Sequence, residues 1–198
     1  MIRMIASDLD KTLIGASGRL TDFSADVIRE SQKAGVRWVL ATAPRILDDS
    51  SDLLPFASYR EDTARVMKIF VFSKFTDRIE EAKGQLADNP QIRVTSSAVW
   101  NLEVNSPVVN KARMLKKLAM ELDIAEDEIM VFGDGENDIS LFQNFRHSRA
   151  VSNSVPQIRN LAESVIESCD HDGVAKEIMR IRSECDRHPE KEEEYMKN

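Results

Sequence analysis

The sequence of 198 residues contains only two cysteines and three histidines, and neither set has the spacing of a metal site. Cys169 and Cys185 are too far apart for a Cys-x-x-Cys motif, and His147, His171 and His188 fall in no metal-ligand pattern. Function by a zinc centre or a redox dithiol is therefore excluded. We expect both cysteines to be ordinary thiols of a cytoplasmic protein.

An excess of positive charge and long apolar runs are also missing. The chain has 27 Lys and Arg residues against 34 Asp and Glu residues, a net charge of −7. Such a balance does not suit a protein that binds nucleic acid or an anionic membrane through phosphate attraction. No apolar run approaches the ~20 residues of a membrane span, and Arg3 and Asp8 interrupt the N-terminal stretch, which argues against a signal peptide. We expect a cytoplasmic protein with a small-molecule ligand.

The first part of the chain alternates strand and helix patterns. Residues 4–7 are an apolar run that ends at Asp8, and residues 21–35 have helical periodicity with Thr21 as N-cap and Gly35 as the end. Residues 36–43 are a β-rich, mostly apolar run that predicts a strand buried on both faces. Strand, helix and strand in this order form a parallel crossover unit.

The same alternation resumes after residue 110. Residues 111–122 predict a helix whose buried face includes Met114 and Leu115, and residues 128–133 predict a buried strand that ends at Gly133. Further helices are predicted over 139–145, 154–162 and 172–181, and strands over 149–153 and 164–168. The pattern predicts an α/β fold with a doubly wound parallel sheet.

A different pattern separates these two parts. Strands over 64–73, 92–97 and 98–104 and a helix over 77–87 predict an inserted βαββ module. We therefore expect a discontinuous core of residues 1–59 and 107–198 and a small inserted cap domain of residues 60–106. Within the small domain we expect Trp100 to be a packing residue, and the alternative is a contact to the ligand.

Polar side chains follow several of the predicted core strands. Asp8 and Asp10 follow the first strand, Thr42 ends the second, and Asp134 and Asp138 follow a later one, while Lys111 begins a helix. Ligands of doubly wound sheets bind at the carboxyl ends of the strands, so we expect these groups to meet there. Carboxylate oxygens without histidine or thiol ligands favour Mg²⁺. The spacing alone decides nothing, because Asp-x-Asp recurs at Asp170 and Asp172; we expect Asp172 to be the N-cap of the last helix.

Four motifs in this order resemble the haloacid dehalogenase superfamily, and specifically its Cof-type phosphatases with an inserted cap. They are "IASDLDKT" at residues 5–12, Thr42 in "VLATA", Lys111 in "VNKARML" and "GDGENDISLF" at residues 133–142. Lys11 departs from the pattern, because Cof-type members usually carry Gly there. The resemblance covers the core and is weak in the insertion. The strand with an Asn-Gly pair that normally precedes the cap has no counterpart around "PFASYRE", so the cap is expected to be short.

The resemblance implies a Mg²⁺-dependent phosphatase that acts on a small phosphorylated metabolite through an aspartyl-phosphate. Asp8 is the expected nucleophile and Asp10 the expected proton shuttle. Thr42, Lys111 and Asn137 are the expected phosphate-binding residues. The expected metal ligands are Asp8, Asp10 through its backbone carbonyl, Asp134 and Asp138.

Two other functions are compatible with the same scaffold. A phosphosugar mutase would transfer the phosphoryl group within a sugar, and phosphate release without a bisphosphate activator would discriminate against it. A non-enzymatic or regulatory relative is the other alternative, although every acid of the motifs is present. Because the expected cap is short, we expect broad specificity or a homodimer that completes the enclosure.

Overall fold

The structure is a computed structural model that describes residues 2–41, 68–96, 99–108 and 110–187. The chain divides into two compact units, the first composed of residues 1–42 and 110–198 and the second of residues 43–109. The expected domain boundaries, 59/60 and 106/107, stay predictions, and the first of them lies outside the described residues. Within the described part of the chain, no helix is both long and apolar enough to span a membrane.

The first unit is built around a parallel sheet of five described strands, in the order β2-β1-β6-β7-β8. The strands are β1 (Met4–Ser7), β2 (Arg37–Leu40), β6 (Ile129–Gly133), β7 (His147–Val151) and β8 (Ser164–Ile166). The helices of this unit are α1 (Asp22–Lys33), α3 (Lys111–Glu121), α4 (Ile139–Asn144), α5 (Pro156–Leu161) and α6 (Gly173–Arg187). The predicted doubly wound α/β fold is confirmed.

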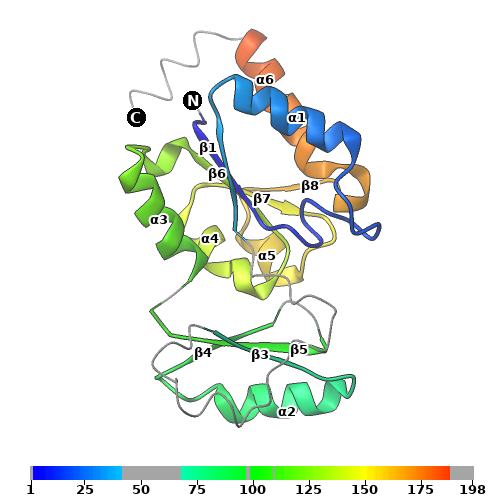
Figure 1. Ribbon diagram of the computed structural model, residues 1–198, viewed down its shortest axis with the longest axis vertical. Helices are drawn as coiled ribbons and strands as arrows, with labels where there is room; N and C mark the ends of the chain where they lie inside the picture. Colours follow the sequence, from blue (N-terminus) through cyan, green and yellow to red (C-terminus); the bar gives the residue numbers. More distant parts are fainter. Residues whose placement is uncertain (1, 42–67, 97–98, 109, 188–198) are drawn as a thin grey trace, which may run out of the picture. The chain divides into compact units, whose positions relative to one another are not determined.

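Helices cover both faces of this sheet. One core cluster joins β1 and β6 to α3, α4 and α5, through residues such as Met4, Leu115 and Ile158. The other joins the same strands to α1 and α6, which pack against each other (Figure 1). Every residue of β6 is buried, which explains its continuous apolar sequence. Burying a side chain such as Phe132 contributes about 1.5–3 kcal/mol, so the two clusters hold the sheet as a rigid platform.

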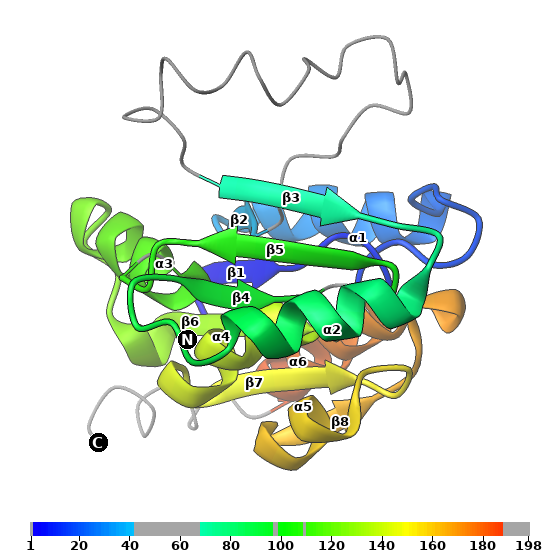
Figure 2. The same cartoon turned by 90° about the horizontal axis from the view of Figure 1, so that it is seen from below.

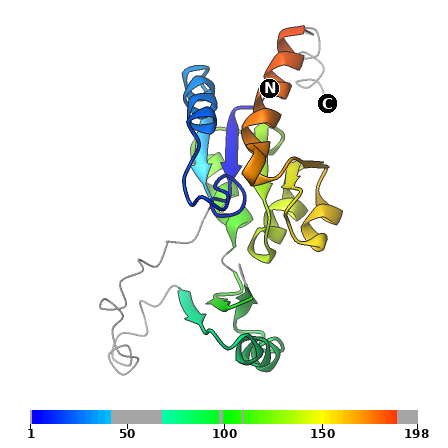
Figure 3. The same ribbon diagram turned by 90° about the vertical axis from the view of Figure 1, so that its right-hand side faces the viewer.

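The direction of the strands determines where a ligand can bind. β1 pairs in parallel with both β2 and β6, so the carboxyl ends of the three strands lie at one edge of the sheet. The loop that follows β1, dark blue in Figure 3, begins at this edge. Thr21 then starts α1 as predicted, because its side chain accepts a hydrogen bond of 3.0 Å from the Ser24 N–H.

Two local predictions in this unit are wrong. β2 is the end strand of the described sheet rather than a strand buried on both faces, and Leu40 is 54% exposed. Met114 is exposed, because the buried face of α3 is formed by Ala112, Leu115 and Ala119. Apolar sequence identified both elements, but neighbouring elements decided which side chains are covered.

The second unit contains the predicted βαββ order. Its elements are β3 (Lys68–Phe72), α2 (Thr76–Leu86), β4 (Arg93–Thr95) and β5 (Asn101–Asn105). The strands form an antiparallel sheet in the order β3-β5-β4, with α2 alongside (Figure 2). Ile79 of α2 and Leu102 of β5 are buried in this unit, whereas Trp100 is 49% exposed. The expectation that Trp100 is a packing residue is therefore wrong.

Candidate active site

Two adjacent parallel strands deliver the central carboxylates. Asp8 directly follows β1 and Asp134 directly follows β6, and the Asp8 N–H donates a 3.1 Å hydrogen bond to the Phe132 carbonyl. Both aspartates are buried, and so is Asp138. One carboxylate oxygen from each of the three acids lies within 4.8 Å of the others. Asp8 and Asp134 are 126 positions apart in sequence, and the parallel pairing of β1 and β6 brings them together.

Asp138 is held in place by the turn that follows β6. It ends a short 3₁₀ helix, η5 (Glu136–Asp138), and its Oδ2 accepts hydrogen bonds from the N–H groups of Asp134 (3.0 Å) and Gly135 (3.2 Å). Its Oδ1 accepts a 2.5 Å hydrogen bond from Lys111 Nζ. The carboxylate is therefore fixed on both oxygens and has little freedom to turn.

Lys111 connects two of the acids. It is the first residue of α3, whose N-cap Asn110 accepts a hydrogen bond from the Arg113 N–H. Its Nζ lies 2.6 Å from Asp8 Oδ1 and 2.5 Å from Asp138 Oδ1. The predicted proximity of Lys111 to the acids is thus seen in the structure, and it places an ammonium group beside the candidate nucleophile.

Burial and mutual repulsion perturb these acids. Burial, reinforced by the charge of Asp138, raises the pKa of Asp8 to about 7 despite the opposing charge of Lys111. The same two causes raise the pKa of Asp134 to about 6, against the opposing hydrogen bond from Thr12 and the charge of Lys11. Burial by itself would lower the pKa of Lys111, but the charges of Asp138 and Asp8 raise it above its ordinary value.

The donor set fits a divalent cation. With all three buried carboxylates ionised, the acids and the one ammonium carry a formal charge of −2, and burial together with the charge of Asp138 raises the pKa of Asp8 and of Asp134. A hard cation with oxygen ligands, as Mg²⁺ is, supplies compensating positive charge. Asp8, Asp134 and Asp138 are the side chains that would hold it.

Asp10, Asn137 and Thr42 are the other predicted site residues. Asp10 is exposed in the loop after β1, where it forms an isolated bridge with Ile14. Asn137 lies partly buried in η5, between the metal-binding candidates. Thr42 lies outside the described residues. The roles of these three residues stay predictions.

Two polar residues near the site received no role from the sequence. Thr12 is buried, and its Oγ1 donates a 3.0 Å hydrogen bond to Asp134 Oδ1, which orients that carboxylate. The sequence feature that could have identified Thr12 is its place at the end of the "IASDLDKT" motif. Asn153 donates from Nδ2 to the Lys11 carbonyl (2.7 Å) and accepts from the Cys169 N–H (3.0 Å). No sequence pattern indicated Asn153, because its partners come from distant loops.

The second Asp-x-Asp pair has a structural role. Asp170 Oδ1 accepts from the Ala16 N–H at 2.8 Å. Asp172 Oδ1 accepts from the hydroxyls of Thr21 (2.5 Å) and Ser24 (2.8 Å), so the side chain does not cap α6 as expected. The hydrogen bond from Asp172 to α6 is made by its backbone carbonyl, which accepts from the Lys176 N–H. Asp170 and Asp172 thus stabilise the loop between β1 and α1 and the start of α1 through hydrogen bonds.

Residue 133 is glycine because a larger residue would collide with the Asp138 side chain. A Cβ at this position would lie 2.6 Å from Asp138 Oδ2 and 2.7 Å from its Cγ, closer than such atoms approach. Its φ is not in the left-handed region, so the close approach of Asp138 is the physical reason for glycine.

We therefore expect Gly133→Ala to displace the Asp138 carboxylate and to reduce the expected phosphatase activity by roughly 10–100-fold, the usual effect of disturbing the support of a metal ligand. Steady-state kinetics at several Mg²⁺ concentrations measures it, and the apparent Mg²⁺ requirement should rise. Gly84→Ala is the matched control, because a Cβ at Gly84 in α2 meets nothing within 4 Å. Equal kinetics for Gly133→Ala and Gly84→Ala would contradict this account.

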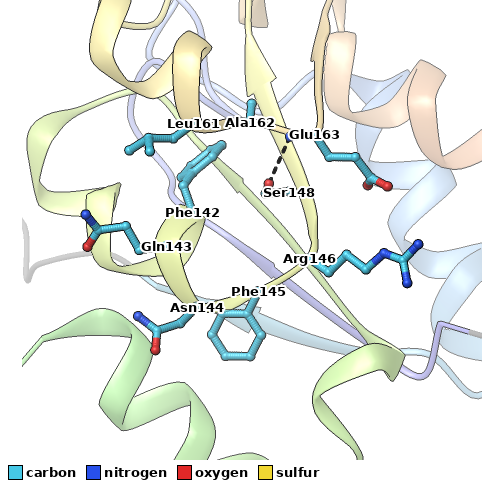
Figure 4. A pocket seen from close by; sticks show the side chains of 9 residues that line it. All are labelled: Phe142, Gln143, Asn144, Phe145, Arg146, Ser148, Leu161, Ala162 and Glu163. Carbon is cyan, nitrogen blue, oxygen red and sulfur yellow. Dashed lines mark hydrogen bonds between the residues drawn. The ribbon is translucent and has the colours of Figure 1, made fainter.

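A pocket of about 380 Å³ lies elsewhere in the first unit. Figure 4 shows its lining by residues from α4, β7 and α5 and the loops between them, with the Glu163 N–H donating to Ser148 Oγ. None of the predicted site residues lines it. Arg146 precedes β7 and Ser148 is near its start, whereas the carboxylates follow strand ends, so this pocket is separate from the candidate site.

The chain belongs to the haloacid dehalogenase-like hydrolase family, whose model matches residues 48–178, more than half of the sequence. The matched range includes Lys111, Asp134 and Asp138 and begins after Asp8 and Asp10. The resemblance noted in the sequence is confirmed. A haloacid dehalogenase-like hydrolase from B. subtilis has the same fold, with a TM-score of 0.77 at 17% identity over 90% of this chain and 99% of that chain.

Curated relatives are similar over part of their length. An uncharacterized hydrolase of Schizosaccharomyces pombe is 26% identical over 80% of this chain and 54% of the relative. A 5-amino-6-(5-phospho-D-ribitylamino)uracil phosphatase of Bacillus subtilis is 30% identical over 60% of this chain and 41% of the relative. A phosphoglycolate phosphatase of Methanothermobacter thermautotrophicus is 25% identical over 85% and 75%, respectively. The chain thus spans about half the length of the first two relatives.

Proposed function

We propose that this protein is a Mg²⁺-dependent phosphomonoester hydrolase that acts on a small phosphorylated metabolite through an aspartyl-phosphate intermediate. The observation that carries the proposal is the buried cluster of Asp8, Asp134 and Asp138, with Lys111 paired to Asp8 and Asp138. Family membership supports it, and so do relatives that are named as phosphatases.

The buried position of Asp8 suits a nucleophile. Its carboxylate oxygen attacks phosphorus while the bond from phosphorus to the leaving oxygen breaks, and Asp10 gives that oxygen a proton. Water then attacks the phosphorus of the aspartyl-phosphate and gives a proton to Asp10, which releases phosphate and restores the Asp8 carboxylate. Asp10 is exposed in the loop two residues further on, where both the leaving group and water have access.

The cationic groups make this attack feasible. Two unit charges of the same sign repel by about 4 kcal/mol at 4 Å with an effective dielectric constant of 20, so a carboxylate approaches a phosphoryl dianion only beside cations. Lys111, already 2.6 Å from Asp8, neutralises part of this charge and binds a phosphoryl oxygen. A bound Mg²⁺ would supply Lewis-acid stabilisation of the phosphoryl oxygens. Thr42 and Asn137 are the other proposed phosphate ligands.

Hydrolysis of p-nitrophenyl phosphate by the purified protein tests the proposal. We expect turnover with Mg²⁺, loss to the background rate in excess EDTA, and recovery when Mg²⁺ is restored. Release of inorganic phosphate without a bisphosphate activator distinguishes a hydrolase from a mutase. Undiminished turnover in EDTA would remove the metal assignment, and no turnover of any phosphate monoester would remove the hydrolase assignment.

A further inference from the structure

Lys11 has an unusual backbone conformation beside the candidate site. Its φ is +61°, in the left-handed region that glycine adopts most easily. The turn is fixed on both sides, because the Lys11 N–H donates to the Ile14 carbonyl at 2.8 Å and the Lys11 carbonyl accepts from Asn153 Nδ2 at 2.7 Å. The other described non-glycine residues with positive φ are Asp123 and Asp172, a residue type that tolerates this region better than lysine.

The conformation of the turn does not explain why residue 11 is a lysine. Left-handed backbone costs a side chain such as lysine about 1–2 kcal/mol, and glycine would form the same turn without that strain. The two hydrogen bonds that fix the turn use only the backbone of Lys11, so any residue would make them. Residues held in such conformations concentrate at functional sites, where the side chain has a use.

The charge of Lys11 acts on the candidate site. Lys11 stands between Asp10 and Thr12, and Thr12 donates a hydrogen bond to Asp134. The Lys11 ammonium lowers the pKa of Asp134, against the effect of burial. The Lys11 side chain is exposed, and its ammonium forms no ion pair with another residue in the part of the chain that the structure describes. Lys11 is therefore an exposed cation beside the residue that contacts Asp134, and no side chain in the described part of the chain pairs with its ammonium.

We propose that Lys11 is a specificity-determining residue that binds an anionic group on the leaving-group side of the substrate. The inference rests on the proposed phosphatase function and extends it to a substrate class: phosphate monoesters whose leaving group carries a carboxylate or a second phosphate. Lys111 is occupied by Asp8 and Asp138 at the inner end of the site, so the two lysines serve different parts of the substrate.

The test compares 2-phosphoglycolate and ethane-1,2-diol bisphosphate with 2-hydroxyethyl phosphate, a substrate of similar length with a neutral leaving group. In the wild type we expect kcat/KM for the anionic substrates to exceed that for the neutral one by about fivefold, the effect of one solvent-accessible ion pair near 1 kcal/mol. Lys11→Gly keeps the turn without the charge, and Lys11→Arg keeps the charge. The preference should vanish in Lys11→Gly through a higher KM and persist in Lys11→Arg.

A binding measurement keeps the result independent of turnover. With Mg²⁺ present, 2-phosphoglycolate should raise the Tm of the wild type and of Lys11→Arg more than 2-hydroxyethyl phosphate does, and this difference should disappear in Lys11→Gly. An unchanged preference in Lys11→Gly would overturn the inference while leaving the phosphatase proposal intact. Preference for only one of the two anionic substrates would identify the group that Lys11 binds. Absence of p-nitrophenyl phosphate turnover in the wild type would instead count against the proposed function.

Discussion

Asp8→Asn is expected to abolish turnover and to leave the protein folded. The proposed nucleophile is lost, which should lower kcat on the order of 10⁴-fold or more. Stability should not fall, because Asp8 is buried beside Asp138 and Asp134 and its pKa is raised to about 7, so removing its charge relieves repulsion. Activity measured together with the Tm of the metal-free protein tests both parts. A large fall in Tm would show that Asp8 is a structural residue.

Asp10→Asn provides the contrasting variant. It keeps the nucleophile but removes the proposed proton shuttle, so the phosphoenzyme should form with an activated aryl phosphate and then persist. Intact-protein mass spectrometry after mixing detects the added phosphoryl group, and peptide mapping locates it. We expect it on Asp8 in Asp10→Asn and not at all in Asp8→Asn. A phosphoryl group on any other residue would show that the assigned roles are wrong.

Lys111→Met is expected to have the largest effect on stability. The change leaves Asp8 and Asp138 buried without their cation, and breaking a buried ion pair in this way costs about 3–5 kcal/mol. At this chain length the loss corresponds to roughly 10 °C in Tm. Activity should also disappear, because the cation beside the nucleophile is gone. Thermal unfolding of the metal-free protein measures the effect, and added Mg²⁺ should recover part of it.

The effect of Lys111→Met should depend on pH in a defined direction. The folded-state pKa of Asp8 is about 7, above its ordinary value of 3.8, so the folded state retains a proton that the unfolded state releases. Stability from such a group is full below the lower value and is lost as pH rises through the folded-state pKa. Without Lys111 the repulsion between the ionised acids is larger. The difference in Tm between wild type and Lys111→Met should therefore be greater at pH 8 than at pH 5.

Lys116→Met is the matched control for this experiment. Lys116 lies on the same helix and pairs with Glu126 at 3.0 Å, but both side chains are partly exposed. An exposed ion pair contributes about 0–1 kcal/mol, so the control should unfold close to the wild type at both pH values. Equal losses for Lys111→Met and Lys116→Met would contradict a special role of the buried cation.

Much of the fold follows from local sequence. The strands β1 and β6 are short apolar runs that stop at aspartates, and Thr21 and Asn110 are cap residues in front of α1 and α3. These signals act over a few residues, since apolar continuity marks a buried strand and a side-chain oxygen satisfies a helix N-terminus. The exposure of individual side chains was predicted less well, because it does not depend on neighbouring residues in sequence. Met114 and Trp100 are apolar yet exposed, because exposure depends on which element packs against each surface.

The sequence by itself determined the kind of chemistry available: acids after strand ends, a lysine at a helix start, and neither a cysteine nor a histidine cluster to compete for a metal. Only the tertiary structure decided which acids act together. Asp8 and Asp134 approach because β1 and β6 are neighbours, whereas Asp170 and Asp172, with the same spacing as Asp8 and Asp10, bind a loop. The physical reason is that burial and charge are properties of the assembled site, since hydrogen bonds and desolvation come from residues distant in sequence.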